Sequence, residues 1–201
     1  MGVVTLASLD AITLDAYGTL VELVDPLPAL QRLLPEFDRG AIRHAFQTEV
    51  AYYRAHASDG RDTATMRALR EDCVGVFNDS LGSTLTADAY VGALEFRVLS
   101  GVVEALDCLR ARGLELAVVG NWDLSLHERL DVIGLRRYFA AVVAAAAKPA
   151  PDGIVDALTH LGVAPERALH VGDDDADAEA AEAAGVRFAP APLREAVASL
   201  A

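Results

Sequence analysis

The clearest structural signal in this chain is the sequence AITLDAYGTL at residues 11–20. Its first four residues predict a short buried strand that ends at Asp15, and Gly18 marks a turn just beyond it. A carboxylate is costly to bury beside apolar strands unless its charge is offset, and open α/β sheets bind ligands at the carboxyl ends of their strands. Asp15 is therefore either a turn cap or a chemical group, and the rest of the chain favours chemistry.

The second half of the chain alternates between predicted helices and strands. Strands are expected at 114–119, 141–144, 168–171 and 186–189, and helices at 102–112, 124–133, 151–161 and 176–184. This alternation predicts an α/β fold with a Rossmann-like, doubly wound, mostly parallel sheet. Residues 28–96 instead carry helical periodicity without a convincing strand. We therefore expect an α/β core from 1–20 and 98–201, with an inserted α-helical subdomain over 21–97.

Composition limits the classes of partner. The 201 residues carry a net charge of −13, which argues against a nucleic-acid backbone or an anionic membrane surface as partner. Neither a signal peptide nor a membrane-spanning run is expected. The only cysteines, Cys73 and Cys108, lack metal-ligand spacing and are interpreted as free thiols of a cytoplasmic protein.

The second strong signal is the acidic sequence GDDDAD at 172–177, which follows the apolar run at 168–171. Its carboxylates repel one another at neutral pH, and a hard cation such as Mg²⁺ takes oxygen ligands and relieves that repulsion. Asp174 and Asp175 are interpreted as residues that favour the start of the following helix. Asp173 and Asp177 are the candidates for a common metal site.

Two further strand ends carry polar residues. Lys148, followed by Pro149, stands among alanines after the weak strand at 141–144. It is either a solvated surface lysine or a cation that balances the acidic cluster and holds a transferring group. Gly120 and Asn121 follow the strand at 114–119, where backbone N–H groups can face an anion. The alternative there is a Gly-Asn turn, with Asp123 as the cap of the next helix.

Together these four signals resemble the motifs of the haloacid dehalogenase (HAD) superfamily, over nearly the whole chain. The first motif corresponds to 15–20, the second to Gly120-Asn121, the third to Lys148-Pro149, and the fourth to Gly172-Asp173 with Asp177. Their order, their strand ends and the helical insert all agree with that superfamily. The resemblance implies a Rossmann-like core, an α-helical cap inserted after the first motif, and a covalent aspartyl intermediate that water hydrolyses.

The resemblance also implies roles for individual residues. Asp15 is implied as the nucleophile, and Lys148 as the cation that steadies it and the phosphoryl oxygens. Mg²⁺ is implied at the Asp15 carboxylate, the backbone carbonyl of Tyr17 and the Asp173 carboxylate. Asp177 is implied as a water-mediated or outer partner of the metal.

The remaining motif positions concern the phosphate and proton transfer. The resemblance implies that Thr19 shapes the first loop and that Gly120 and Asn121 lie at the phosphate site. Phosphatases of the superfamily usually carry a second Asp, as general acid and base, where this chain has Tyr17. A phenol is a poor base at neutral pH, so a loss of activity of about a hundredfold or more is expected. Those phosphatases also usually carry Ser or Thr where this chain has Gly120.

Two other functions remain open at this point. The sequence DAYGTL at 15–20 resembles 2-haloacid dehalogenases of the same superfamily, which need no metal. Their fourth motif typically has Ser and Asn where this chain has Asp173 and Asp175. Their halide-binding arginine has no clear counterpart in this chain, and Arg32, Arg39 and Arg43 are no more than candidates. The third alternative is a non-catalytic protein that binds a metal, a phosphate or another protein.

The acidic fourth motif favours a Mg²⁺-dependent phosphatase over the dehalogenase. The expected partner is a small, phosphorylated metabolite, with no nucleic acid and no membrane, and the protein is expected to be a monomer or a homodimer. Substrate choice is expected to lie in the helical insert, where the candidate residues are Tyr52, Tyr53, His56 and Arg61.

Overall fold

The structure, a computed structural model, describes residues 8–199. The chain forms two compact units. One is built from the chain up to Glu22 and from Val98 onward, and the other from Leu23–Arg97. The first unit holds a parallel sheet flanked by helices, and the second is helical. Among residues 8–199, no helix combines the length and the apolar character needed to cross a bilayer.

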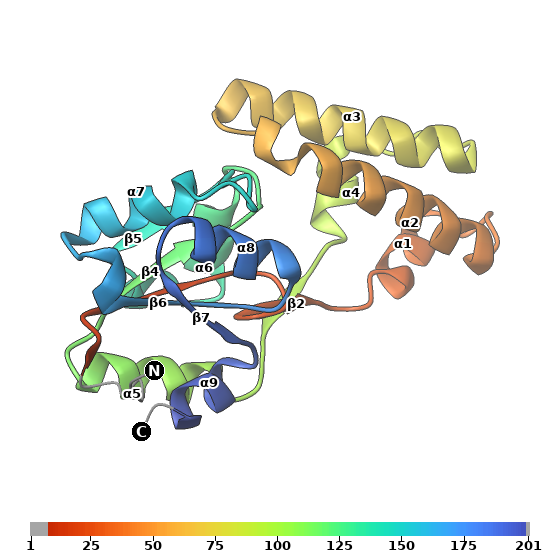
Figure 1. The fold of residues 1–201 in the computed structure, drawn as a ribbon. Helices are drawn as coiled ribbons and strands as arrows, with labels where there is room; N and C mark the ends of the chain where they lie inside the picture. Colours follow the sequence, from red (N-terminus) through yellow and green to blue (C-terminus); the bar gives the residue numbers. More distant parts are fainter. Residues whose placement is uncertain (1–7, 200–201) are drawn as a thin grey trace. The chain divides into compact units, whose positions relative to one another are not determined.

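The first unit is built on a sheet with the strand order β5-β4-β1-β6-β7 (Figure 1). The strands are β1 (Ala11–Leu14), β4 (Glu115–Val119), β5 (Ala141–Val143), β6 (Ala168–Gly172) and β7 (Arg187–Pro190). The central strand is β1, in which Leu14 pairs with Val118 on one side and Val171 on the other. All neighbouring pairs are parallel, so the carboxyl ends of the strands lie at one edge of the sheet. The predicted parallel sheet is confirmed.

Helices cover both faces of this sheet. The pair α5 (Val102–Ala111) and α9 (Leu193–Ser199) lies on one face, and α7 (Asp152–Leu161) and α8 (Asp175–Ala183) lie on the other (Figure 1). The helix α6 (Leu126–Val132) belongs to the connection from β4 to β5, and short 3₁₀ turns occur at Arg136–Tyr138 and Pro165–Arg167. The doubly wound α/β architecture is therefore confirmed.

Apolar burial holds this unit together. Ala11, Ile12 and Leu14 of β1 are fully buried, as expected of a central parallel strand covered on both faces. Small residues dominate the cluster between the sheet and α7 and α8; its fully buried members include Ala11, Ala117, Val119, Ile154, Ala157, Ala168, Ala180 and Ala181. Alanines let the helices approach the sheet closely, which explains the many alanines in the second half of the chain.

Two features of this unit differ from the sequence prediction or go beyond it. Helix α6 begins at Leu126 rather than at 124, because the Asp123 carboxylate accepts a hydrogen bond from the Ser125 N–H at 2.7 Å and holds a turn before the helix. The prediction ended with the last strand, whereas the structure adds α9, which buries Leu193, Ala196 and Val197.

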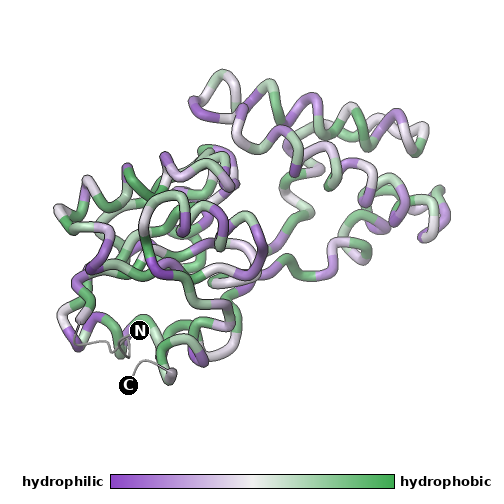
Figure 2. Tube along the Cα trace, in the orientation of Figure 1, coloured by the Kyte–Doolittle hydropathy of each residue, from purple (hydrophilic) through white to green (hydrophobic). Residues whose placement is uncertain are grey.

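The second unit contains α1 (Leu27–Leu33), α2 (Arg39–His56), α3 (Thr63–Leu81) and α4 (Ala87–Gly92), with a 3₁₀ turn at Ala57–Asp59. Hydrophobic and hydrophilic residues alternate along α2 and α3, as in amphipathic helices (Figure 2). Asp38 caps α2, Asp62 caps α3, and Thr86 caps α4. The short strands β2 (Val21–Leu23) and β3 (Phe96–Val98), which the prediction did not include, pair where the chain passes between the units.

A buried carboxyl group lies inside the helical unit. The Tyr90 hydroxyl donates to Glu49 Oε2 at 2.7 Å, and the Cys73 side chain also forms a hydrogen bond with Glu49. The ring of Phe77 lies 4.9 Å from that of Tyr90, between centroids. Burial raises the pKa of Glu49, and the two hydrogen bonds oppose the rise without cancelling it. This cluster joins α2, α3 and α4.

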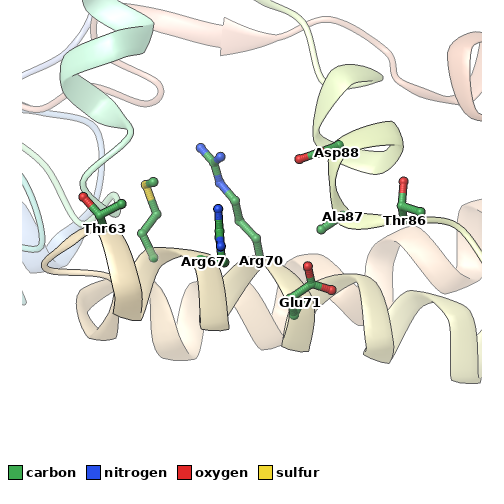
Figure 3. A pocket seen from close by; sticks show the side chains of 8 residues that line it. Thr63, Arg67, Arg70, Glu71, Thr86, Ala87 and Asp88 are labelled. Atoms are coloured by element: carbon green, nitrogen blue, oxygen red, sulfur yellow. The ribbon is translucent and has the colours of Figure 1, made fainter.

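The helical unit also has a hollow of about 320 Å³ between α3 and α4 (Figure 3). Arg67 and Arg70 extend from α3 along the hollow, and Asp88 lies on α4. The lining residues are Thr63, Met66, Arg67, Arg70, Glu71, Thr86, Ala87 and Asp88. Because guanidinium and carboxylate groups both line it, the hollow does not have one sign of charge.

Candidate active site

The carboxyl edge of the sheet brings the four sequence motifs together. Asp15 directly follows the central strand β1, Gly120 follows β4, and Asp173 follows β6. Lys148 reaches the same edge from the loop after β5. Each motif was predicted at a strand end, and the strand order now explains why residues far apart in sequence meet.

Lys148 is the centre of the site. Its ammonium nitrogen donates to Asp15 Oδ1 at 2.6 Å and also to Asp177 Oδ1. All three side chains are buried, and Lys148 is the only lysine in the sequence. The alternative of a solvated surface lysine is therefore wrong. A buried ammonium between two carboxylates fixes their separation and compensates their charge.

Asn121 holds the backbone of Lys148. Its amide nitrogen donates to the Lys148 carbonyl at 2.8 Å, and its amide oxygen accepts from the Lys148 N–H at 2.7 Å. Two alanines of the same loop, Ala145 and Ala147, have φ angles of 52° and 57°, in the left-handed region. A left-handed conformation costs an alanine roughly 1–2 kcal/mol, so the loop that delivers Lys148 is kept in place by its contacts rather than by local preference.

Asp177 is saturated with hydrogen-bond donors. Its Oδ1 contacts Lys148 and, at 3.2 Å, His170 Nε2, while its Oδ2 accepts from the backbone N–H groups of Asp173 at 3.1 Å and Asp174 at 3.4 Å. Asp174 caps α8 by accepting from the Asp177 N–H, which confirms its predicted capping role. A Cβ on Gly172 would lie 2.2 Å from the Asp177 carboxylate carbon, so the close approach requires glycine.

The charges of the site shift three pKa values. Burial raises the pKa of Asp15 to about 7; the negative charge of Asp177 adds to the rise, and the Lys148 ammonium opposes it. Burial tends to lower the pKa of Lys148, but the two carboxylates outweigh burial and raise it. Burial also acts to raise the pKa of Asp177, yet hydrogen bonds from His170 and the charge of Lys148 bring it below its usual range. Lys148 is therefore a stable cation, and Asp177 a stable anion.

Three carboxylates form a group that can hold a cation. Asp15, Asp173 and Asp177 each offer an oxygen, and these oxygens lie within 4.8 Å of one another. One lysine compensates only one of the three charges, which leaves a negative excess when all are ionised. Oxygen donors with such an excess suit a hard divalent cation such as Mg²⁺. The residues present therefore fit the metal that the fourth motif predicts.

The first loop passes close to Asp173 of this group. Gly18, with a φ angle of 81°, lies so close to Asp173 that a Cβ would come within 2.1 Å of Asp173 Oδ2. Within residues 8–199, the adjacent Tyr17 carbonyl oxygen accepts no backbone hydrogen bond. The Tyr17 side chain is 43% exposed, so the phenol is open to solvent.

A family model described as haloacid dehalogenase-like hydrolase matches residues 9–185. The chain belongs to this hydrolase family. The order of its four motifs and the contacts of Asp15, Lys148 and Asp177 agree with that membership.

Among curated relatives, phosphoglycolate phosphatase 1 of Pseudomonas aeruginosa is 31% identical over 87% of this chain and 66% of that protein. Phosphoglycolate phosphatase of Aquifex aeolicus is 41% identical over 42% of each chain. The chain thus spans less than two thirds of the length of these relatives. Among solved structures, L-2-haloacid dehalogenase of Xanthobacter autotrophicus has a TM-score of 0.66 and 24% identity over 90% of this chain and 77% of that chain. That likeness shows the shared fold.

The structure also shows which atoms surround two other predicted site residues, Thr19 and Gly120. The Thr19 side chain is buried, and its hydroxyl has no hydrogen-bond partner within residues 8–199. A Cβ at Gly120 would lie 3.2 Å from Leu126 and 3.6 Å from the Ala16 methyl group, so a serine there would be tightly packed. Their predicted contact with phosphate stays a prediction.

The predicted specificity residues lie in the helical unit. Tyr52 and His56 stack with ring centroids 4.1 Å apart, His56 Nδ1 lies 2.8 Å from the Tyr52 carbonyl oxygen, and Arg61 donates to the Ser58 carbonyl. Tyr53 is half-buried on α2. The three arginines considered for halide binding are exposed on the same unit, and Arg39 pairs with Asp25 at 3.6 Å. The part of these side chains in substrate choice or halide binding stays a prediction.

The sequence analysis missed two residues that touch the site's network. Neither His170 nor Thr13 belongs to the four motifs, and the prediction did not single them out. Both are fully buried, and His170 contacts Asp177 directly. For Thr13 a signal was present in the spacing, because it lies two positions before Asp15 and alternate strand residues share a face. For His170 the signal is tertiary, because it pairs with Thr13 only in the register of the sheet.

Proposed function

We propose that this protein is a Mg²⁺-dependent hydrolase of a small phosphate monoester, with Asp15 as the nucleophile. The observation that carries the proposal is the contact of the sole lysine with Asp15 and Asp177, beside the exposed carboxylate of Asp173. Family membership supports hydrolysis, and the curated relatives named phosphoglycolate phosphatase support a phosphate ester as substrate.

The metal would be held by the carboxylates of Asp15 and Asp173 and by the Tyr17 carbonyl. Asp177, whose oxygens already accept four hydrogen bonds, would act through water or through Lys148. When bound, Mg²⁺ supplies positive charge that stabilises phosphoryl oxygens and favours the ionised form of Asp15.

The chemistry takes two displacements at phosphorus. Asp15 Oδ2, the oxygen that is not paired with Lys148, attacks phosphorus, and the ester P–O bond breaks to release the alcohol. Water then attacks phosphorus of the aspartyl phosphate, the P–O bond to Asp15 breaks, and inorganic phosphate leaves. The Lys148 ammonium stabilises the negative phosphoryl oxygens in both steps.

Tyr17 affects the two steps differently. Its exposed phenol can donate a proton to the leaving alcohol oxygen, and solvent returns that proton to the phenolate before the second step. The protonated phenol is then a poor base toward the attacking water. We therefore expect hydrolysis of the aspartyl phosphate to limit turnover, and we expect Tyr17→Asp to increase kcat by about a hundredfold. A Tyr17→Phe variant serves as the matched control, because it lacks any acid or base at this position.

The proposed substrate is a small phosphorylated acid of the phosphoglycolate type, because that is the substrate named for the curated relatives. We further propose that the inserted helical unit selects the substrate, as the cap expected from the sequence. Cys73 and Cys108 form no disulfide with each other, which fits a reducing compartment such as the cytoplasm.

The decisive test is phosphate release from phosphoglycolate and a panel of other phosphorylated metabolites, with and without Mg²⁺. The proposal expects release that needs both the metal and Asp15, and that Asp15→Asn reduces to background. Asp175→Asn is the matched control, because Asp175 is exposed and lies outside the carboxylate group. Absence of release across the panel, or release that Asp15→Asn retains, would contradict the proposal.

A second candidate function, metal-independent dehalogenation, is favoured by one observation. Tyr17 stands where a phosphatase usually has a second Asp, and displacement of halide from carbon requires no acid for the leaving group. Halide release from 2-haloacids in the presence of a chelator would support this function. The exposed Asp173 argues against it, because its charge would repel a carboxylate substrate.

A further inference from the structure

The buried network of the core extends beyond the residues that would touch substrate or metal. His170 of β6 and Thr13 of β1 are directly paired in the parallel register, so their side chains lie on one face of the sheet. Thr13 Oγ1 lies 2.8 Å from His170 Nδ1, and His170 Nε2 lies 3.2 Å from Asp177 Oδ1. Both residues are fully buried.

The available donors and acceptors decide which atom donates in each of these contacts. A neutral histidine ring carries one N–H and one acceptor nitrogen, and the two ring nitrogens of His170 face Asp177 and Thr13. An ionised carboxylate only accepts, so the N–H must be on Nε2 and point to Asp177. Nδ1 is then the acceptor for the Thr13 hydroxyl. The Thr13 hydroxyl, the His170 ring and the Asp177 carboxylate thus form one series of hydrogen bonds from donor to acceptor.

The chain of contacts closes a ring. From Thr13 it passes through His170 and Asp177 to Lys148, and Lys148 returns it to Asp15, two residues after Thr13 on the same strand. The His170 N–H and the Lys148 ammonium share one carboxylate oxygen of Asp177. The direction in which Asp177 presents that oxygen to Lys148 is therefore held partly by His170.

We propose that His170, oriented by Thr13, is a positioning residue that fixes Asp177 and through it the Lys148 ammonium beside Asp15. This inference rests on the proposed function only for its effect on turnover. The effect on Lys148 itself is independent of any reaction. Losing the link lets Lys148 move away from the nucleophile, which weakens its contact with the phosphoryl oxygens in the transition state more than it weakens substrate binding.

Two pairs of variants test the link. His170→Leu removes the donor to Asp177, and Thr13→Val removes the hydroxyl with little change of shape. His170→Gln and Thr13→Ser are the matched controls, because each retains a donor of the required kind. We expect the first pair to lower kcat by about 10- to 100-fold with a KM change of less than about threefold, and the second pair to restore most of the rate.

The sole lysine offers a readout that needs no activity. Acylation of Lys148 by an amine-reactive reagent, followed by mass spectrometry of its peptide, reports how firmly the ammonium is held. We expect slow acylation in the parent, His170→Gln and Thr13→Ser, and acylation at least about tenfold faster in His170→Leu and Thr13→Val. Acylation within about twofold of the parent in both Leu and Val variants would overturn the inference.

The two readouts separate this inference from the proposed function. If the parent shows no phosphatase activity but the acylation pattern appears, the positioning link stands and the proposed function fails. If activity is present but kcat is unchanged in His170→Leu and Thr13→Val, the positioning role fails alone. Should His170→Leu not fold, Thr13→Val still decides, because it deletes one hydroxyl from a position that tolerates valine in a buried strand.

Discussion

Two buried carboxyl groups, one in each unit of the molecule, have pKa values shifted in opposite directions. In the α/β unit, Asp177 is buried but receives a charged lysine and a histidine N–H, and its pKa falls below the usual range. In the helical unit, Glu49 is buried against the uncharged Tyr90 hydroxyl and the Cys73 thiol, and its pKa rises. At Asp177 the charged and uncharged donors together outweigh burial, whereas at Glu49 two uncharged donors oppose burial without outweighing it. Asp15 shares the Lys148 ammonium but faces the negative charge of Asp177, and its pKa still rises to about 7.

The largest effect is expected from removing the charge of the α/β cluster. Lys148→Met leaves Asp15 and Asp177 buried without a cation, which costs about 3–5 kcal/mol of the free energy of unfolding and about 100- to 1,000-fold in kcat. Urea unfolding and steady-state kinetics measure the two losses. Lys148→Arg is the control for charge. If Lys148→Met loses less than about 1 kcal/mol of the free energy of unfolding, the cation does not stabilise the buried carboxylates as expected.

A metal is expected to stabilise the α/β cluster and not the helical one. At about one hundred times its dissociation constant, Mg²⁺ should add about 2.7 kcal/mol to the free energy of unfolding. Asp173→Asn should lose most of this gain, and Asp175→Asn should keep it. Thermal unfolding with and without Mg²⁺ checks the prediction, and equal gains in the two variants would show that the acidic group is not the site.

The helical cluster is expected to contribute to stability alone. Tyr90→Phe leaves the buried Glu49 with one donor fewer and should cost about 1–3 kcal/mol in urea unfolding. The control is Tyr138→Phe, which removes a hydrogen bond of 2.8 Å to the exposed carboxylate of Asp107 and should cost less. Equal costs for the two variants would mean that burial of Glu49 carries no penalty.

The smallest effect is a difference in pH dependence. Because the pKa of Glu49 is raised in the folded state, the folded protein binds more protons than the unfolded chain between the ordinary and the raised pKa. This group therefore lowers stability as pH rises through that window. Glu49→Gln keeps an acceptor for Tyr90 and removes the titration. The variant should gain stability relative to its parent as pH rises above the ordinary pKa of glutamate. If the free energy of unfolding changes with pH in the same way in Glu49→Gln and its parent, the prediction is wrong.

The two clusters also differ in how far the sequence predicts them. Asp15, Lys148 and Asp173 were predictable because each polar residue follows a strand, and parallel strands bring their carboxyl ends together. The predicted metal group and the lysine contact come from that single rule. The sequence could not show that the Asn121 amide forms two hydrogen bonds with the Lys148 backbone, because these bonds depend on the path of two loops.

The contacts of polar residues inside apolar runs were harder to predict from the sequence. Thr13 and His170 resembled ordinary strand residues until the register placed them opposite each other. Glu49 lies in the apolar stripe of its helix, but its partner Tyr90 is 41 residues away on another helix. Such partners follow from tertiary packing, which periodicity along one segment does not encode.

The central claim is that Lys148 keeps Asp15 available as a nucleophile, and the aspartyl phosphate is its most direct product. The measurement is an acid quench of the enzyme during turnover of phosphoglycolate with Mg²⁺, followed by mass spectrometry of the peptide that holds Asp15. We expect one phosphoryl group on Asp15 in the parent and none in Asp15→Asn. The group should be less abundant in Tyr17→Asp, because this substitution speeds hydrolysis of the aspartyl phosphate. Turnover with no phosphoryl group on Asp15, or with one on another residue, would contradict the central claim.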